Sequence, residues 1–293
     1  MIRRLDEWQR RHRLPGFGYA VVCKYFDDGG PREAALITYY GFLGMFPVLL
    51  LAVTIVSEVL RNRPELRLQI IDGFVPPALR ADVDAAVASM PTSHAAWIVG
   101  ILGLAYTATG VVLSAYFTLN HLAAVAWRDR TGYVSRYLRV LGALLVLLAG
   151  IVGTALLPAA AAFVTAFAVL WLLAWLLLDR PAPLRALWPA ALLGAGAVTL
   201  MLELGAWLLP RLIRGAGPVY GGFATVAGIF TLLYLLSNAL VLSAEVAAVR
   251  WASLWPRALD PSRPTAADLR LVALLKREQE RFGPAGATPP PDR

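Results

Sequence analysis

The sequence predicts an all-α, polytopic integral membrane protein with six transmembrane helices and an N-terminal interfacial helix. Hydrophobic residues make up 58% of the 293 residues and charged residues only 16%, whereas soluble domains carry about 25% charged residues. The charges are also segregated, because six uncharged blocks hold 150 residues and every Asp, Glu, Lys and Arg lies outside them. A water-soluble core does not distribute charge in this way, so the chain is predicted to cross a membrane several times.

Continuous apolar runs of about 20 residues cross a bilayer as helices, because backbone polar groups in lipid must bond within their own segment. The uncharged block 140–178 would extend roughly 58 Å as one helix, which is too long for one crossing. We therefore divide it at Pro158, since proline breaks a helix. The six predicted spans are 34–59, 95–127, 138–157, 159–178, 186–209 and 221–249.

The basic residues predict the orientation of these spans. The N-terminal segment, the second and fourth loops and the C-terminal tail together hold 21 of the 27 Lys and Arg residues. Loops rich in Lys and Arg stay in the cytoplasm, so we expect a multi-pass membrane protein with both termini cytoplasmic. The net charge of +8 is then a signal of topology and of contact with anionic lipid, and we expect no nucleic-acid partner.

Three segments are predicted to lie outside the bilayer. Residues 1–33 mix basic and aromatic residues, which favours an interfacial helix on the anionic inner leaflet, with a disordered basic tail as the alternative. The outer loop 60–94 is expected to form short amphipathic helices. In the tail 253–293, Thr265 and Asp268 have the spacing of a capping box, which predicts a short helix over 265–282 followed by a disordered end.

Composition and motifs argue against an enzyme. One cysteine, Cys23, excludes a disulfide framework, and three histidines supply too few ligands for a histidine-rich metal site. The sequence has no Walker A loop, dinucleotide fingerprint, HExxH or GxSxG motif. We expect no catalytic residue, no cofactor and no metal.

A few polar residues interrupt the predicted spans and are candidates for a substrate pathway. Ionisable groups in a membrane are costly and usually face the bundle interior or a cavity, which singles out Glu203 and Glu245. Tyr234, Asn238 and Glu245 share one helical face, and Arg250 lies near enough along the helix to neutralise Glu245. The alternative for each is a structural polar contact between helices.

The first two spans add further candidates. Asn120 and His121 are consecutive, so they cannot share a helical face, and a structural role for His121 is favoured over proton transfer. Kinked helices often line cavities, which draws attention to the first span. The predicted substrate-pathway residues are Glu203, Asn238, Glu245, Tyr234, Asn120, Tyr39 and Tyr40, and the predicted helix kinks are Pro47 and Pro158.

Four segments resemble the YihY/BrkB family of bacterial inner-membrane proteins. They are AALITYYGFLGMFPVLLLAV (34–53), YFTLNHLAAVAWRDR (116–130), LRALWPAALLGA (184–195) and VYGGFATVAGIFTLLYLLSNALVLSAEVAAV (219–249). The resemblance covers roughly residues 15–252. It rests on the order and spacing of the four segments together.

The resemblance implies a role in the integrity of the cell envelope. Its leading interpretation is a transporter or flippase for a lipid or another amphiphilic envelope component, with membrane lipids as partners. A non-transporting membrane scaffold is the alternative, and whether the chain forms a homo-oligomer stays open. The family was once labelled a tRNA-processing ribonuclease, which this sequence disfavours because it offers no metal-ligand cluster.

Overall fold

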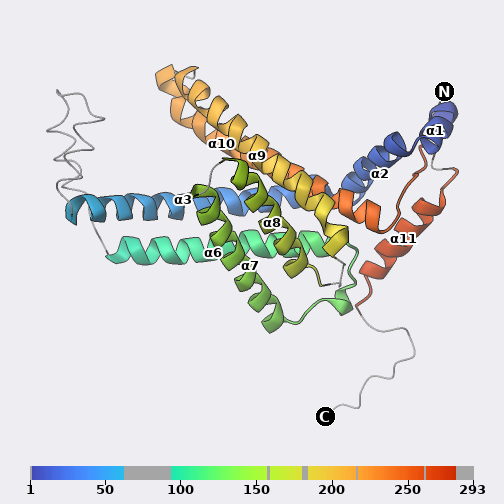
Figure 1. The fold of residues 1–293 in the computed structure, drawn as a ribbon, viewed down its shortest axis with the longest axis horizontal. Helices are drawn as coiled ribbons and strands as arrows, with labels where there is room; N and C mark the ends of the chain where they lie inside the picture. The colour runs from blue at the N-terminus through green and yellow to red at the C-terminus, as the bar shows by residue number, and fades with distance from the viewer. Residues whose placement is uncertain are drawn as a thin grey trace, which may run out of the picture. The chain divides into compact units, whose positions relative to one another are not determined.

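The structure, a computed structural model, describes residues 2–62, 94–156, 159–179, 184–215, 217–260 and 262–281. Every regular element in these ranges is helical, which confirms the predicted all-α class (Figure 1). The elements are α1 (Ile2–Arg11), α2 (Arg13–Asp27), α3 (Gly30–Asn62), α6 (His94–Leu122), the 3₁₀ turn η2 (Trp127–Asp129), α7 (Tyr133–Leu156), α8 (Ala159–Leu177), α9 (Leu184–Gly215), α10 (Gly217–Trp251) and α11 (Ala266–Glu278).

Five of the described helices are long and apolar enough to cross a membrane. A sixth, α8, has a shorter apolar stretch, Ala161–Leu177, which is about 25 Å long at 1.5 Å per residue. The long apolar block does divide into two helices, since α7 ends at Leu156 and α8 begins at Ala159. Pro158, the predicted break, lies outside the described residues. The five candidate spans are Gly30–Leu51, His94–Leu122, Tyr133–Ile151, Arg185–Leu208 and Val226–Trp251.

The second span ends earlier than predicted, at Leu122 instead of residue 127. Ala124 adopts a left-handed conformation with φ of +49°. Its N–H donates to the carbonyl oxygen of His121 at 2.8 Å, and the N–H of Val125 donates to that of Asn120 at 2.9 Å. This left-handed reversal satisfies the last carbonyls and closes the helix, although the sequence beyond it is still apolar.

Two helices continue beyond a proline, and the expected kink at Pro47 stays a prediction. Helix α3 runs through Pro47 to Asn62, and α9 runs through Pro210 to Gly215, beyond its predicted end at residue 209. Membrane helices tolerate proline because neighbouring groups and small local adjustments satisfy the freed carbonyl. Of the predicted outer loop, residues 60–62 belong to α3, and the short helices expected in 63–93 lie outside the described residues.

The chain divides into two compact units, Met1–Thr38 with Val111–Arg293 (unit 1) and Tyr39–Gly110 (unit 2). Within unit 2, α3 and α6 approach closely at small residues. A Cβ at Gly110 would lie 2.2 Å from Cδ1 of Tyr40, and a Cβ at Gly44 would lie 3.3 Å from Oγ1 of Thr107. Glycine is therefore required at position 110 for Tyr40 to occupy its place.

Unit 1 is a stack of antiparallel helix pairs joined by apolar side chains. Helix α10 packs along α9, α9 on α8 and α8 on α7. One core joins Val112 and Tyr116 of α6 to Val140 of α7 and Leu177 of α8. The sequence predicted the helices, and their apolar faces supply this packing.

The N-terminal segment is helical and packs into unit 1. Helix α2 lies against α10. Ala20 and Val21 of α2 are buried with Val249, Leu254 and Leu271. This segment was expected at the lipid surface, and the burial of one of its faces in the helical core was not predicted.

Four segments that the basic-residue count placed on one side of the membrane are linked by hydrogen bonds and ion pairs in unit 1. Arg257 of the tail pairs with Asp27 at 2.6 Å. Arg139, early in α7, pairs with Asp179, just past the end of α8, at 2.8 Å. Arg128 of η2 pairs with Glu280 of the tail at 3.0 Å. The expected capping box of α11 is present at Thr265 and Asp268, and residues beyond 281 lie outside the description.

Candidate functional site

Lys24 of α2 is buried and makes three contacts with other parts of unit 1. Its Nζ donates to Oε2 of Glu245 at 2.9 Å, to the carbonyl oxygen of Leu122 at 2.9 Å and to Oδ2 of Asp28. A lysine ammonium has three N–H groups, so each is used. Only 3% of Lys24 is exposed, because α2 turns this face against α10.

Glu245, predicted as a costly acid in the last span, is completely buried and paired with Lys24. The expectation that Arg250 neutralises it is wrong. Arg250 is exposed on α10 and its guanidinium lies 5.9 Å from the ring centroid of Trp188. The position five residues after Glu245 faces another side of the helix, whereas α2 brings a cation directly onto it.

The charge of Lys24 is secured by its carboxylate partners. Burial lowers the pKa of Lys24, and the nearby charges of Glu245 and Asp28 outweigh burial, so its pKa is raised overall. Lys24 therefore remains an ammonium at neutral pH. Buried charges of this kind persist only when they are paired and hydrogen-bonded.

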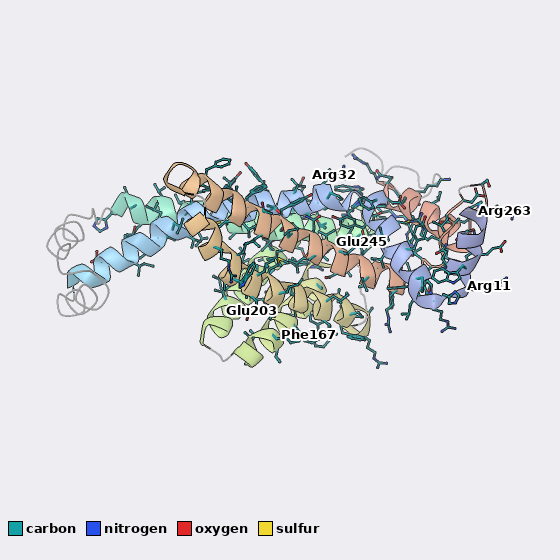
Figure 2. All side chains as sticks on the ribbon, turned by 90° about the horizontal axis from the view of Figure 1, so that it is seen from above. Arg11, Arg32, Phe167, Glu203, Glu245 and Arg263 are labelled. Carbon is teal, nitrogen blue, oxygen red and sulfur yellow. The ribbon has the colours of Figure 1, made fainter. Side chains whose placement is uncertain are left out.

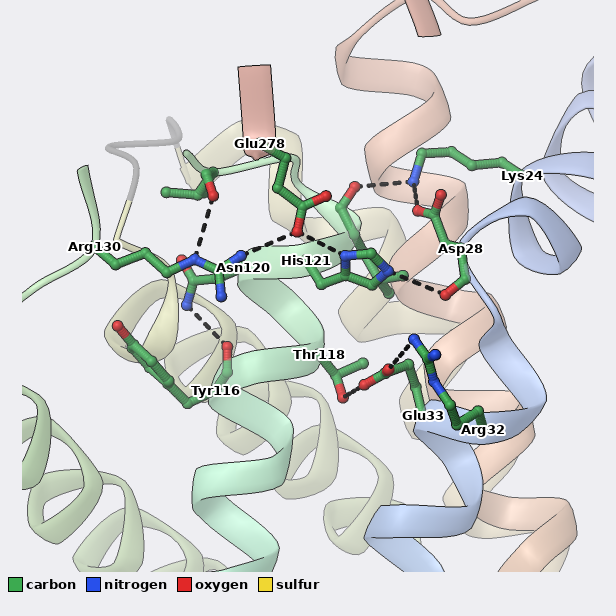
Figure 3. A network of polar contacts seen from close by, with 12 residues as sticks. Lys24, Asp28, Arg32, Glu33, Tyr116, Thr118, Asn120, His121, Arg130 and Glu278 are labelled. Atoms are coloured by element: carbon green, nitrogen blue, oxygen red, sulfur yellow. Dashed lines mark hydrogen bonds and ion pairs between the residues drawn. The ribbon is translucent and has the colours of Figure 1, made fainter. Parts of the chain in front are cut away.

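A second set of charges lies beside the first, around His121 (Figure 3). Its Nδ1 lies 2.7 Å from Oε1 of Glu278 on α11, and its Nε2 lies 3.0 Å from the carbonyl oxygen of Asp28. Nη2 of Arg130 donates to the same Glu278 oxygen at 3.1 Å. Both ring nitrogens face oxygen atoms, an arrangement that the imidazolium form of His121 satisfies with its two N–H groups.

We call these side chains the buried charge cluster. With His121 protonated, its positive and negative groups balance. One oxygen of each carboxylate is buried and has no hydrogen-bond partner among the described residues: Oδ1 of Asp28, Oε1 of Glu245 and Oε2 of Glu278. The members are Lys24, Arg130 and His121 as cations and Asp28, Glu245 and Glu278 as anions.

One cavity is lined by members of this cluster, and a second cavity shares lining residues with the first. The first cavity, of about 90 Å³, has a mostly apolar wall formed by residues of α6, α8, α9, α10 and α11, in which Lys24, Asp28 and His121 are the ionisable residues. The second cavity, of about 200 Å³, is lined almost entirely by aliphatic residues of α3 and α6 to α10. Both are lined by Leu119, Ala174, Ala190 and Ala244. Small side chains at three of these four positions leave the space between the helices.

Asn120, another predicted candidate, is fully buried and binds the backbone. Its Nδ2 donates to the carbonyl oxygens of Tyr116 at 2.8 Å and Leu177 at 2.9 Å, and its Oδ1 accepts the N–H of Asp179 at 2.9 Å. These bonds hold the end of α8 against α6. Asn120 lines neither cavity, so its contacts are those of a structural residue.

Asn238 and Tyr234 lie against α2 and line neither cavity. Oδ1 of Asn238 accepts the hydroxyl of Tyr25, and its Nδ2 donates to the carbonyl oxygen of Tyr234 at 2.6 Å. Glu203 is exposed on the surface of α9 and lines neither cavity, and Figure 2 marks it apart from Glu245. The structure therefore groups Glu245 with residues other than those predicted to accompany it.

Tyr39 and Tyr40 belong to unit 2. Tyr39 is 54% exposed, and its ring centroid lies 5.1 Å from that of Tyr40. Tyr40 packs over Gly110. Within unit 2 these two tyrosines form an aromatic contact at the approach of α3 and α6.

Sequence reasoning missed Lys24, Asp28 and Glu278. One signal was available for Lys24, which is one of two lysines in a chain with 27 basic residues and stands in the apolar stretch GYAVVCKYF. A lysine in such a stretch is expected to be either at a membrane surface or paired in the interior. Nothing in the sequence names its partner.

The family model described as virulence factor BrkB matches residues 21–265. The chain belongs to the BrkB family. With five long apolar helices among its described residues, it is a multi-pass membrane protein of that family. The match includes every member of the buried charge cluster except Glu278. No curated protein and no solved structure matches the chain.

Proposed function

We propose that this BrkB protein transports or flips a lipid or another amphiphilic envelope component across the bacterial inner membrane. The observation that carries the proposal is the pair of cavities that share Leu119, Ala174, Ala190 and Ala244. An amphiphile needs a polar site for its head group directly beside an apolar site for its chain. The two cavities offer this combination within one helical unit.

The proposed topology has six crossings and cytoplasmic termini. The pairing of Arg139 with Asp179 supports α8 as a crossing, because it brings the end of α8 back to the beginning of α7. The same end of unit 1 carries the basic segments that the positive-inside rule assigns to the cytoplasm. Trp8, Leu14 and Phe26 are exposed apolar residues among exposed basic ones, which suits contact with anionic inner-leaflet lipid.

Reconstitution tests the proposal. The full chain in liposomes with a fluorescent lipid should move label between leaflets faster than empty liposomes, measured by chemical quenching of the outer leaflet. Ala190→Leu should slow this movement severalfold, since it adds three carbons where both cavities meet. Ala206→Leu is the matched control, because Ala206 is exposed on the same helix. Equal rates for protein-containing and empty liposomes would refute transport.

A non-transporting scaffold is the second candidate, supported by Asn120, whose contacts are all structural. It predicts no lipid movement and no difference between the two alanine variants. We propose no catalytic step. Among the described residues, no group of three or more His, Cys, Asp or Glu side chains could hold a metal ion, so the ribonuclease alternative has no candidate site there.

A further inference from the structure

We propose that a surface pocket at the start of α9 and the end of α10 binds the phosphate of an anionic phospholipid head group. The pocket is lined by Arg185, Ala186, Arg250 and Trp251 and encloses about 500 Å³, a volume within the range of small-molecule sites, about 300–1,000 Å³. The inference goes beyond the proposed function, because a lipid can be held here whether or not the protein transports one.

The two arginines of the pocket carry positive charge that the protein does not neutralise. Both are exposed. Within the described part of the chain neither guanidinium forms an ion pair, and that of Arg250 lies 5.9 Å from the ring centroid of Trp188. The first turn of α9 holds no acidic residue, so the positive end of the helix dipole adds to the charge of Arg185. An anion is the ligand that this charge favours.

The side-chain type narrows the anion to a phosphate or a carboxylate. A guanidinium presents parallel N–H groups that match two oxygens of one such group, and it gives up its hydration more readily than an ammonium does. None of the four lining residues is acidic. A zwitterionic head group would therefore bring its own cation next to two arginines without finding an acceptor, whereas an anionic head group would not.

The position of the pocket along the helices favours a lipid over a soluble anion. One candidate membrane span begins at Arg185 and another ends at Trp251, so the pocket lies where two spans leave the hydrocarbon region. Trp188 and Trp251 are 41% and 50% exposed, and exposed tryptophan is enriched at the level of the head groups. In the proposed topology this level belongs to the inner leaflet, where anionic lipids gather.

One face of α9 has the order of groups that a phospholipid needs. Arg185, Trp188 and Leu192 follow one another at steps of three and four residues, so they lie on one face of the helix, and all three are exposed. The charged group comes first, and the apolar groups extend from it along the span. A phosphate at Arg185 would thus have its acyl chains beside Trp188 and Leu192.

The test measures lipid binding to the unaltered full-length protein by native mass spectrometry from detergent. Phosphatidylglycerol and phosphatidylcholine with identical acyl chains are compared. We expect phosphatidylglycerol to bind about tenfold more tightly, the factor that corresponds to one additional charge-assisted contact. Inorganic phosphate at tenfold excess over the lipid should not displace it, because free phosphate lacks the acyl chains.

Variants locate the preference. Replacing Arg185 and Arg250 together by glutamine should reduce the preference to near unity. Replacing both by lysine should leave an intermediate preference, because lysine keeps the charge and loses the paired N–H groups. The matched control replaces Arg263 and Lys276 by glutamine, which removes the same charge from exposed positions of the tail, and it should retain the full preference.

The outcomes separate a lipid site from its alternatives. Equal binding of the two lipids, or a preference that survives the double glutamine variant, would overturn the site. An equal loss in the tail control would show attraction to net charge alone and would overturn it as well, and displacement by inorganic phosphate would overturn its assignment to a lipid. Absence of lipid movement in liposomes would refute transport and leave this site standing.

Discussion

Replacing Lys24 by methionine should destabilise the helical unit strongly. Methionine nearly preserves the length of the side chain and removes the charge and all three N–H groups. The carboxylates of Glu245 and Asp28 would then remain buried without their cation. Because Glu245 has no exposed surface and Lys24 only 3%, solvent cannot take over the role of the missing partner.

The size of the effect follows from this burial. Removing one partner of a buried ion pair typically costs about 3–5 kcal/mol. For a unit of this size that corresponds to a fall in unfolding midpoint on the order of 10 °C. The raised pKa of Lys24 means that its contribution is fully present below the unfolded value of about 10.4 and is lost only as pH rises through the higher folded value. The loss should therefore be constant across neutral pH.

Thermal unfolding of the detergent-solubilised full chain, followed by tryptophan fluorescence, measures this loss. Lys276→Met is the matched control, since Lys276 is the other lysine of the chain and is exposed, and it should change the stability by less than about 0.5 kcal/mol. Adding Glu245→Gln to Lys24→Met should restore part of the stability, because it removes one orphaned charge. If the Lys24→Met variant has the same unfolding midpoint as the wild type, the buried pairing of Lys24 with Glu245 and Asp28 is refuted.

Three further changes test other parts of the structure. Asn120→Asp should cost about 2–4 kcal/mol in thermal unfolding, because it removes two backbone-bound donors and adds a buried charge; an unchanged melting curve would contradict the assigned contacts. Asp268→Asn should loosen α11 by about 1 kcal/mol, seen as faster proteolysis of the tail. A tail that resists protease equally well in the variant would contradict the role of Asp268 in capping α11. Burial raises the pKa of Asp268, but its hydrogen bonds lower the pKa overall. The stabilisation by Asp268 is therefore present above the unfolded pKa near 3.9 and is lost as pH falls through the lower folded pKa. Gly110→Ala should displace Tyr40 and lower the melting temperature, whereas Gly41→Ala, with open space around its Cβ, should not.

The helices could be predicted closely because their signal is local. Apolar runs mark each span, and the capping box at Thr265 marks the start of α11. The end of α6 could not be predicted, since residues 123–127 are as apolar as the helix before them. The left-handed turn at Ala124 ends that helix, and nothing in the local sequence demands it.

The candidate site could be predicted only in part. Glu245 was identified because a carboxylate in an apolar run is anomalous by itself. Glu203 was chosen by the same argument, and the structure leaves it exposed on α9. The rule that singles out intramembrane acids does not distinguish a side chain that meets a partner from one that faces outward.

The sequence by itself determined the class of this protein, its helices and the segregation of its basic residues. These follow from the cost of placing a charge in lipid, which each residue incurs wherever its neighbours lie. The tertiary structure decided which charges meet. Lys24 and Glu245 are 221 residues apart along the chain, and only the packing of α2 against α10 brings the ammonium onto the carboxylate. The two cavities depend in the same way on small residues from several helices, which no single stretch of sequence can place side by side.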